Sequence, residues 1–420
     1  MKNIAFFQLF KTNSFVQNVT ALFSANALGQ LFPFLALPLL VLFYSTTDFA
    51  FYFMFSAIAM LLPLITSFKL ELAFVTVDEP ELKDVFSAGI WLSITLSLLY
   101  TVFFGLANEH LLRWIGMKDP AHDFRLIALS SFMLTIGQLI EYMLNRRNSF
   151  KQIAIIRVIR STSTVLMQLV LGYFWGLTNG LILGMLAGQF IYLCAAIAYS
   201  QIQTYFVLSS FSNLLRIWKK HRGFSFYVTL TNAINVFSDQ LPLFLFSRFL
   251  GPNYTAQYGM SNRVGVMPAN LAAFSLSQVF YKHAADKLTA GNNIRESIKK
   301  LFKNISILAI APGLIVMIAS PFLFPLFFGE EWRMAGYYLA ILMPMVILSL
   351  YTGASSSLVY VRNRQKELFY YALINAIVRV IAFLLCYYIT QNHWLIITVF
   401  SLLGCIYHSL LIRWMLVIAK

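Results

Sequence analysis

The segment 178–200, TNGLILGMLAGQFIYLCAAIAYS, contains no charged residue. A helix needs about 20 apolar residues to cross the hydrocarbon core of a bilayer, so this segment is long enough to span a membrane. Similar runs recur along the chain, in which 59% of the 420 residues are hydrophobic and 11% are charged. Soluble globular proteins have about 25% charged residues. We therefore expect a membrane protein without a sizeable soluble domain.

Apolar runs bounded by charged residues, glycine or proline predict twelve membrane-spanning helices. They lie at 20–45, 49–68, 85–107, 124–145, 153–175, 178–200, 224–249, 254–280, 302–328, 334–357, 367–390 and 393–416. The predicted fold class is an all-α polytopic membrane protein, with about twelve transmembrane helices in two six-helix lobes. An even number of spans places both termini on the same side of the membrane.

The distribution of basic residues predicts which side that is. If both termini are cytoplasmic, the inner segments hold 24 of the 31 lysines and arginines, and the outer segments hold 5. Cytoplasmic loops of membrane proteins are enriched in these two residues. We therefore predict cytoplasmic termini. We attribute the net charge of +15 to this topology and not to nucleic-acid binding.

The longest link between apolar runs, 201–223, falls near the middle of the chain. The predicted domains are an N-terminal six-helix lobe at 1–210, a cytoplasmic linker at 211–223 and a C-terminal six-helix lobe at 224–420. An offset of 206 positions aligns Asn26-Ala27-Leu28 with Asn232-Ala233-Ile234. Transporters built from two related bundles bind their substrate where the bundles meet.

The chain carries no motif of a known catalytic or nucleotide-binding site. It has no H-E-x-x-H, no G-x-x-x-x-G-K-[ST], no G-x-S-x-G and no pair of carboxylates in a long loop. The three cysteines, Cys194, Cys386 and Cys405, lie in apolar runs without C-x-x-C spacing. We predict that the protein is not an enzyme and has no cofactor, metal site or disulfide.

Two arginines belong to neither the inner nor the outer segments, Arg263 about nine residues into the eighth span and Arg379 midway along the eleventh. An arginine at the centre of a membrane helix costs about 2.5–3.5 kcal/mol to insert, so it normally faces a partner or a water-filled cavity. In one interpretation each arginine pairs with a carboxylate, such as Asp239 or Glu141, or with helix carbonyls. In the other, both line a cavity and bind an anionic ligand.

Further polar residues interrupt the apolar runs. Asp239 and Gln240 stand beside a proline in the seventh span, and Asp239 is either a coupling-ion or proton site or the counter-charge of an arginine. Glu141 is a cavity candidate, or an interfacial carboxylate tied to Arg146 and Arg147, the basic residues at the predicted inner mouth. The amides that could bond either sugar hydroxyls or neighbouring helices are Asn26, Gln30, Asn232 and Asn262.

Several short motifs follow one another in order along the chain. They are Leu144-Asn145-Arg146-Arg147, Phe150-Lys151-Gln152-Ile153-Ala154, Arg157-Val158-Ile159, Gln240-Leu241-Pro242, Gly251-Pro252, Asn262-Arg263-Val264, Ser277-Gln278-Val279-Phe280-Tyr281, Phe328-Gly329-Glu330-Glu331-Trp332-Arg333 and Ala335-Gly336. As an ordered set they resemble the polysaccharide flippases. These are the O-antigen translocase (Wzx-type) members of the multidrug/oligosaccharidyl-lipid/polysaccharide exporter superfamily.

This resemblance implies a function. The protein would flip an undecaprenyl-pyrophosphate-linked oligosaccharide, an O-antigen or related repeat unit, from the inner to the outer leaflet of the bacterial cytoplasmic membrane by alternating access. Arg263 would lie in the lumen, with Arg379 as a second cavity residue. The implied partners are this lipid-linked glycan, membrane lipids, a glycan polymerase and a chain-length regulator. The alternatives are a cation-coupled drug exporter of the same superfamily and a membrane glycan polymerase or ligase.

Overall fold

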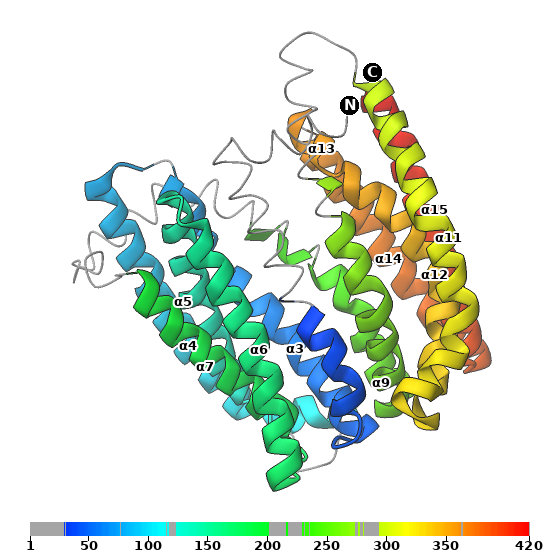
Figure 1. Ribbon diagram of the computed structural model, residues 1–420, viewed down its shortest axis with the longest axis horizontal. Helices are drawn as coiled ribbons and strands as arrows, with labels where there is room; N and C mark the ends of the chain where they lie inside the picture. The colour runs from blue at the N-terminus through cyan, green and yellow to red at the C-terminus, as the bar shows by residue number, and fades with distance from the viewer. Residues whose placement is uncertain are drawn as a thin grey trace, which may run out of the picture. The chain divides into compact units, whose positions relative to one another are not determined.

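The computed structural model describes residues 29, 31–75, 77–114, 116, 123–200, 216, 229–230, 232–234, 236–273, 276–277, 280, 294–362 and 364–419. Within these ranges all regular structure is helical, and nine helices are long and apolar enough to cross a membrane (Figure 1). The predicted all-α polytopic membrane fold is confirmed. The predicted spans 20–45, 224–249 and 254–280 are described only in part. The total of twelve spans and the cytoplasmic termini therefore stay predictions.

The chain forms two compact units, Met1–Phe237 and Ser238–Lys420. The predicted linker at 211–223 lies outside the described residues, apart from Arg216. The predicted lobe and linker boundaries therefore stay predictions.

The first unit contains a short apolar helix, Leu31–Leu40, and five candidate membrane spans. The spans are α3 (Thr46–Thr66), α4 (Glu79–Trp114), α5 (Leu126–Arg146), α6 (Phe150–Trp175) and α7 (Gly180–Ser200), with the 3-10 helix η1 (Leu70–Val75) after α3. A capping box starts α3, since the Asp48 backbone N–H donates to the Ser45 hydroxyl and the Ser45 backbone N–H donates to the Asp48 carboxylate. A buried cluster that includes Phe86, Leu139 and Tyr192 joins α4, α5 and α7.

Helices α6 and α7 approach closely because two glycines of α7 face α6. A Cβ atom on Gly184 would lie 2.6 Å from the backbone nitrogen of Gln168, and one on Gly188 would lie 2.5 Å from that of Thr164. Neither position has room for a side chain. Small residues four positions apart let membrane helices pack backbone to backbone.

The second unit begins in α-helical residues, 238–245. Two five-residue π-helices follow, η3 (Phe246–Leu250) and η4 (Asn262–Val266), on either side of α9 (Pro252–Ser261). The remaining elements are α11 (Arg295–Phe328), η5 (Glu330–Trp332), α12 (Arg333–Ser355), α13 (Ser357–Val361), α14 (Gln365–Thr390) and α15 (His393–Ile418). Helix α12 packs against α11 and α15, and α15 packs against α14. The 34 residues of α11 would extend roughly 51 Å, beyond the hydrocarbon core of about 30 Å.

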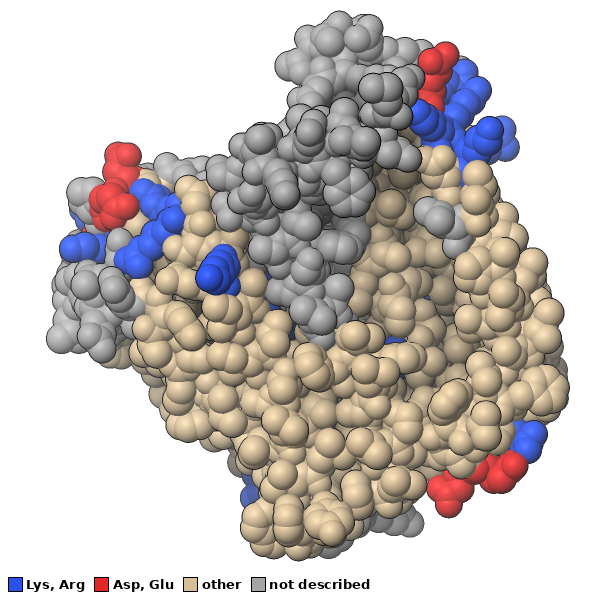
Figure 2. Space-filling model, viewed as in Figure 1, with Lys and Arg blue, Asp and Glu red and all other residues tan. Residues whose placement is uncertain are grey.

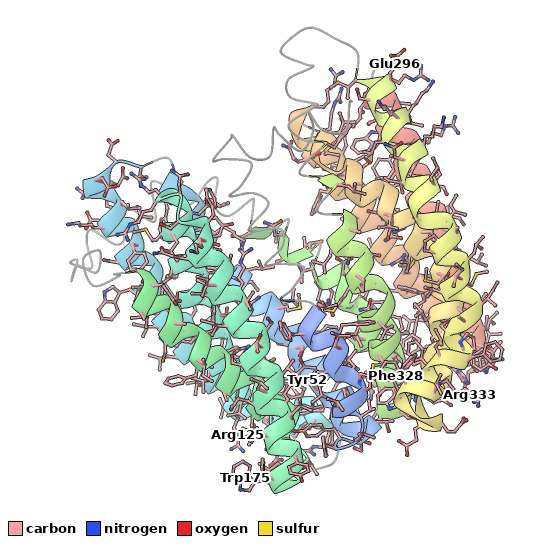
Figure 3. The ribbon with its side chains drawn as sticks, viewed as in Figure 1. Tyr52, Arg125, Trp175, Glu296, Phe328 and Arg333 are labelled. Carbon is pink, nitrogen blue, oxygen red and sulfur yellow. The ribbon has the colours of Figure 1, made fainter. Side chains whose placement is uncertain are left out.

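Charged side chains gather toward the ends of the helices in each unit, and the visible face between those ends carries mostly other residues (Figure 2). Trp175 and Arg125 lie at the same end of the first unit (Figure 3). The aromatic residues Tyr173, Phe174 and Trp175 are 68%, 69% and 64% exposed there. Exposed aromatic rings at helix ends are typical of the membrane–water interface. Both units therefore have the surface of membrane-embedded bundles.

The α6–α7 contact generates a prediction. Gly188→Leu should force the two helices apart and should lower the yield and the thermal stability of the detergent-purified protein. Gly105→Leu is the matched control, because a Cβ on Gly105 of α4 meets no atom within 4 Å. Fluorescence-detected size-exclusion chromatography after a heating series measures both variants. Equal melting of the two would contradict the close contact.

Candidate functional site

Arg379 lies near the middle of a membrane span. It stands 14 residues after the first residue of α14 and 11 before its last. These separations correspond to roughly 21 and 16 Å along the helix axis, which places the Cα far from both ends of the span. The charge of this side chain must therefore be stabilised within the membrane interior.

The guanidinium group of Arg379 rests on an aromatic ring. Its central carbon lies 4.2 Å from the centroid of the Phe400 ring on α15. Its Nη2 lies 3.3 Å from the sulfur of Met345 on α12. A desolvated cation–π contact contributes about 2 kcal/mol or more. Nε is buried and has no hydrogen-bond partner among the described residues, so part of the donor capacity of the guanidinium remains open to an acceptor.

A glycine on α15 makes room for this arrangement. A Cβ atom on Gly404 would lie 2.5 Å from Nη2 of Arg379 and would also overlap the sulfur of Met345. Gly404 itself is buried. The guanidinium of Arg379 can therefore cross the surface of α15 at this position only because the residue has no side chain.

Asp239 is the nearby acidic group. It interacts electrostatically with Arg379, as do Tyr258 and Tyr407. Asp239 and Arg379 make no direct ion pair within 4.0 Å. Asp239 is exposed, whereas Tyr258 is 4% exposed and stacks on Phe246 with ring centroids 4.9 Å apart. Asp239 therefore offsets the charge of Arg379 without occupying its donors.

The remaining candidates have no described contact with Arg379 or lie outside the described residues. Asn262 and Arg263 are half-buried in η4. π-Helical turns are rare and frequently occur at functional sites. Gln240, beside Asp239, and Asn232, in the first unit, are also half-buried. Asn26 and Gln30 lie outside the described residues.

The expected partners of Glu141 were wrong. Glu141 is buried on α5 and accepts hydrogen bonds from Arg157 Nη2 at 2.7 Å and Nε at 2.9 Å, not from Arg146 or Arg147. The hydroxyl of Tyr192 on α7 donates to its second oxygen at 2.8 Å. The i to i+16 separation of Glu141 and Arg157 closes across the α5–α6 turn, so the carboxylate meets the next helix instead of its own last turn.

Arg146 and Arg147 bond to backbone carbonyls. Nη1 of Arg146 donates to the carbonyl oxygens of Phe74 and, at 2.6 Å, Val77, next to η1. Nη1 of Arg147 donates to the carbonyl oxygen of Ser200, the last residue of α7, at 2.8 Å. Arginine side chains often satisfy the last carbonyls of helices in this way. The structure therefore gives both residues a role in closing helix ends, besides the predicted role at the inner mouth.

Sequence reasoning missed the residues that surround Arg379 and Glu141. They are Tyr258, Met345, Phe400, Gly404 and Tyr407 in the second unit and Arg157, Arg160 and Tyr192 in the first. Arg157 and Arg160 carried a usable signal, since both fall inside the predicted span 153–175. Phe400 and Met345 carried none, because aromatic and sulfur-containing side chains are ordinary in apolar spans.

The fold is similar to that of several solved structures. One similar solved structure is "Lipid II flippase MurJ, inward closed conformation", with a TM-score of 0.76 and 14% identity over 95% of this chain and 87% of that one. Another is an inward-facing "multidrug resistance MATE family transporter of the MOP superfamily", with a TM-score of 0.67 and 15% identity over 94% of this chain and 93% of that one. At such identities the likeness defines the fold, which is that of the MOP superfamily.

The profile of the family "Polysaccharide biosynthesis protein" matches residues 39–337, and the chain belongs to this family. It is 22% identical over 248 residues to the lipopolysaccharide biosynthesis protein WzxC of Escherichia coli, covering 58% of this chain and 49% of that protein. It is 22% identical over 348 residues to the succinoglycan biosynthesis transport protein ExoT of Rhizobium meliloti, covering 82% of this chain and 68% of that protein. The chain thus spans about half the length of WzxC. The predicted resemblance to polysaccharide flippases and the location in a bacterial inner membrane are confirmed.

The Phe400 contact generates a prediction. Phe400→Leu removes the ring under Arg379 and should lower polysaccharide export about thirtyfold, which corresponds to about 2 kcal/mol. Phe400→Tyr keeps the ring and should retain export. Surface polysaccharide is quantified in a deletion strain carrying each variant at matched membrane levels. Equal export by the Leu and Tyr variants would rule out a role for the ring.

Proposed function

We propose that this protein flips an undecaprenyl-pyrophosphate-linked oligosaccharide, such as an O-antigen or related repeat unit, from the inner to the outer leaflet of the bacterial cytoplasmic membrane. Transport proceeds by alternating access and makes or breaks no covalent bond. The observation that carries this proposal is Arg379, a mid-span cation whose buried Nε has no hydrogen-bond partner within the described part of the chain. Membership of the polysaccharide biosynthesis family supports a polysaccharide precursor as the cargo.

The chemistry of the cargo matches this cation. A pyrophosphate-sugar head cannot cross hydrocarbon unaided, because the burial of an unpaired charge costs many kcal/mol. An arginine fork binds phosphate oxygens in a bidentate geometry, and it does so most strongly where water is excluded. Arg379 would hold the phosphoryl oxygens, Arg263 and the candidate amides would contact the head group, and the polyprenyl tail would stay in lipid.

The membrane potential can bias the direction of transport. Each negative charge that moves outward across a negative-inside membrane gains about 2.3 kcal/mol per 100 mV. Asp239 interacts with the charge of Arg379, so an oxyanion bound at Arg379 would repel the carboxylate of Asp239. The further partners in this proposal are membrane lipids, a glycan polymerase and a chain-length regulator.

A complementation experiment tests the function. Arg379→Ala should abolish surface polysaccharide in a strain lacking its own flippase, and Arg379→Lys should retain part of it, because lysine keeps the charge but not the fork. Arg113→Ala is the control, since the Arg113 side chain is 68% exposed and pairs with Glu109. Full export by Arg379→Ala would refute the proposal. A wild-type protein that lowered drug susceptibility without restoring polysaccharide would indicate drug export.

The inward-to-outward direction depends on the topology, which labelling tests. In a variant with the three native cysteines replaced by serine, Lys299→Cys should be shielded from a membrane-impermeant maleimide in intact cells. Arg333→Cys should react from outside. Glu296, three residues before Lys299 in α11, and Arg333 lie at opposite ends of the second unit (Figure 3). The side chains of Lys299 and Arg333 are both exposed. The reverse labelling pattern would overturn the proposed orientation.

A further inference from the structure

A second pair of arginines lies in the first unit, on α6. Arg157 and Arg160 are three residues apart, so their side chains share one face of the helix. Arg160 is 10 residues beyond the first residue of α6, or roughly 15 Å along the axis. A bilayer core is about 30 Å thick, so Arg160 lies at a depth where an unmatched charge is costly.

The first of these arginines is neutralised. Both Nη2 and Nε of Arg157 donate to one oxygen of Glu141, at 2.7 and 2.9 Å. The other oxygen of Glu141 accepts the hydroxyl of Tyr192 at 2.8 Å. Glu141 is 8% exposed and Tyr192 is fully buried. One carboxylate is thus fully used by one arginine and one hydroxyl.

The second arginine has no such partner. The guanidinium carbon of Arg160 lies 5.2 Å from the centroid of the Tyr192 ring. No carboxylate of the described residues lies within 4.0 Å of it. The cluster therefore contains two arginines and one carboxylate, and it keeps one positive charge inside the span.

Arg160 lies on the face of α6 that packs against α7. Thr164 and Gln168, four and eight residues further on, are the residues that Gly188 and Gly184 of α7 approach. Arg160 itself is partly exposed. A membrane-buried arginine that is neither paired nor on the apolar side is typical of a surface that water or an anion reaches.

The ring that carries Arg160 is held in place from α5. A Cβ atom on Gly137 would lie 2.6 Å from both Cζ and the hydroxyl oxygen of Tyr192. The ring therefore fits against α5 only because residue 137 is glycine, and the bond to Glu141 fixes its hydroxyl. The guanidinium of Arg160 lies over a ring whose position is already set, so little side-chain entropy remains to be lost when an anion binds.

We propose that Arg160, held on the Tyr192 ring, is an oxyanion-binding residue of the first unit that takes a phosphoryl or pyrophosphoryl group. This site is separate from Arg379, and its assignment to cargo rests on the proposed function. Arginine suits the role because its planar fork matches two phosphate oxygens. The Glu141–Arg157 pair keeps the site selective, because it removes one positive charge and orients the ring without offering a free carboxylate.

Binding to the purified full-length protein in nanodiscs of neutral lipid tests the proposal. Microscale thermophoresis is run with two probes, undecaprenyl pyrophosphate and inorganic pyrophosphate. Arg160→Gln should weaken binding about tenfold, as expected for the loss of a charge-assisted contact of roughly 1.4 kcal/mol. Arg125→Gln is the control, since Arg125 is exposed and pairs with Asp123 at 2.8 Å. A loss for both probes identifies a site for the free anion, and a loss for the lipid alone identifies a headgroup site.

A second series separates binding from folding. Tyr192→Phe keeps the ring and loses the hydroxyl, so it should bind within about twofold of wild type. Tyr192→Leu loses the ring and should reproduce the weakening seen with Arg160→Gln. Arg160→Lys should be intermediate and should retain the salt dependence of binding. Each variant is compared only at an unchanged melting temperature.

The outcomes distinguish this inference from the proposed function. If Arg160→Gln binds both probes with unchanged affinity, the oxyanion site is overturned, even if the wild type restores polysaccharide. If Arg160→Gln does not fold, unchanged affinity of Arg160→Lys and Tyr192→Leu overturns it instead. If Arg160→Gln weakens binding but the wild-type protein does not restore polysaccharide, the oxyanion site is supported and the proposed cargo is refuted. Loss of both affinity and export in the Arg160 variants supports the two together.

Discussion

The structure depends on the cost of a charged group inside hydrocarbon. Two arginines within membrane helices, Arg157 and Arg379, bear that cost in different ways. Arg157 uses a carboxylate on the neighbouring helix, and Arg379 uses an aromatic face, a sulfur and the field of an acid that does not contact it. The proposed function rests on this difference. A fully paired arginine fixes helices, whereas an arginine held by a ring keeps hydrogen-bond donors for a ligand.

Glycine makes these arrangements possible in both units. At Gly137 and Gly404 the missing side chain leaves space for a ring and for a guanidinium group, respectively. At Gly184 and Gly188 it lets α6 and α7 meet backbone to backbone. Lipid supplies no hydrophobic drive for helix association, so packing at such short range and a few polar contacts hold the bundle together. The same contacts therefore stabilise the helices and position their polar side chains.

The sequence predicted the nine described spans, because spans of about 20 apolar residues leave a signal that needs no tertiary information. The resemblance to polysaccharide flippases came from the ordered set of motifs. The sequence also singled out Arg379 and Asp239, since charged residues inside spans are rare. It failed for Glu141, whose assumed partners Arg146 and Arg147 are engaged by backbone carbonyls. Sequence proximity suggested that pairing, and the α5–α6 turn decided otherwise.

The amino-acid sequence by itself determined that this is a helical membrane protein, where most of its spans lie, and that cations occur at membrane depth. Hydrophobicity is a local property, so each short stretch of sequence shows it without knowledge of the fold. Only the tertiary structure decided which cations are neutralised, because Glu141, Arg157 and Tyr192 lie on three different helices, which the fold brings together. It likewise decided that the guanidinium of Arg379 rests on Phe400. Nothing in the sequence indicates that these two residues are in contact.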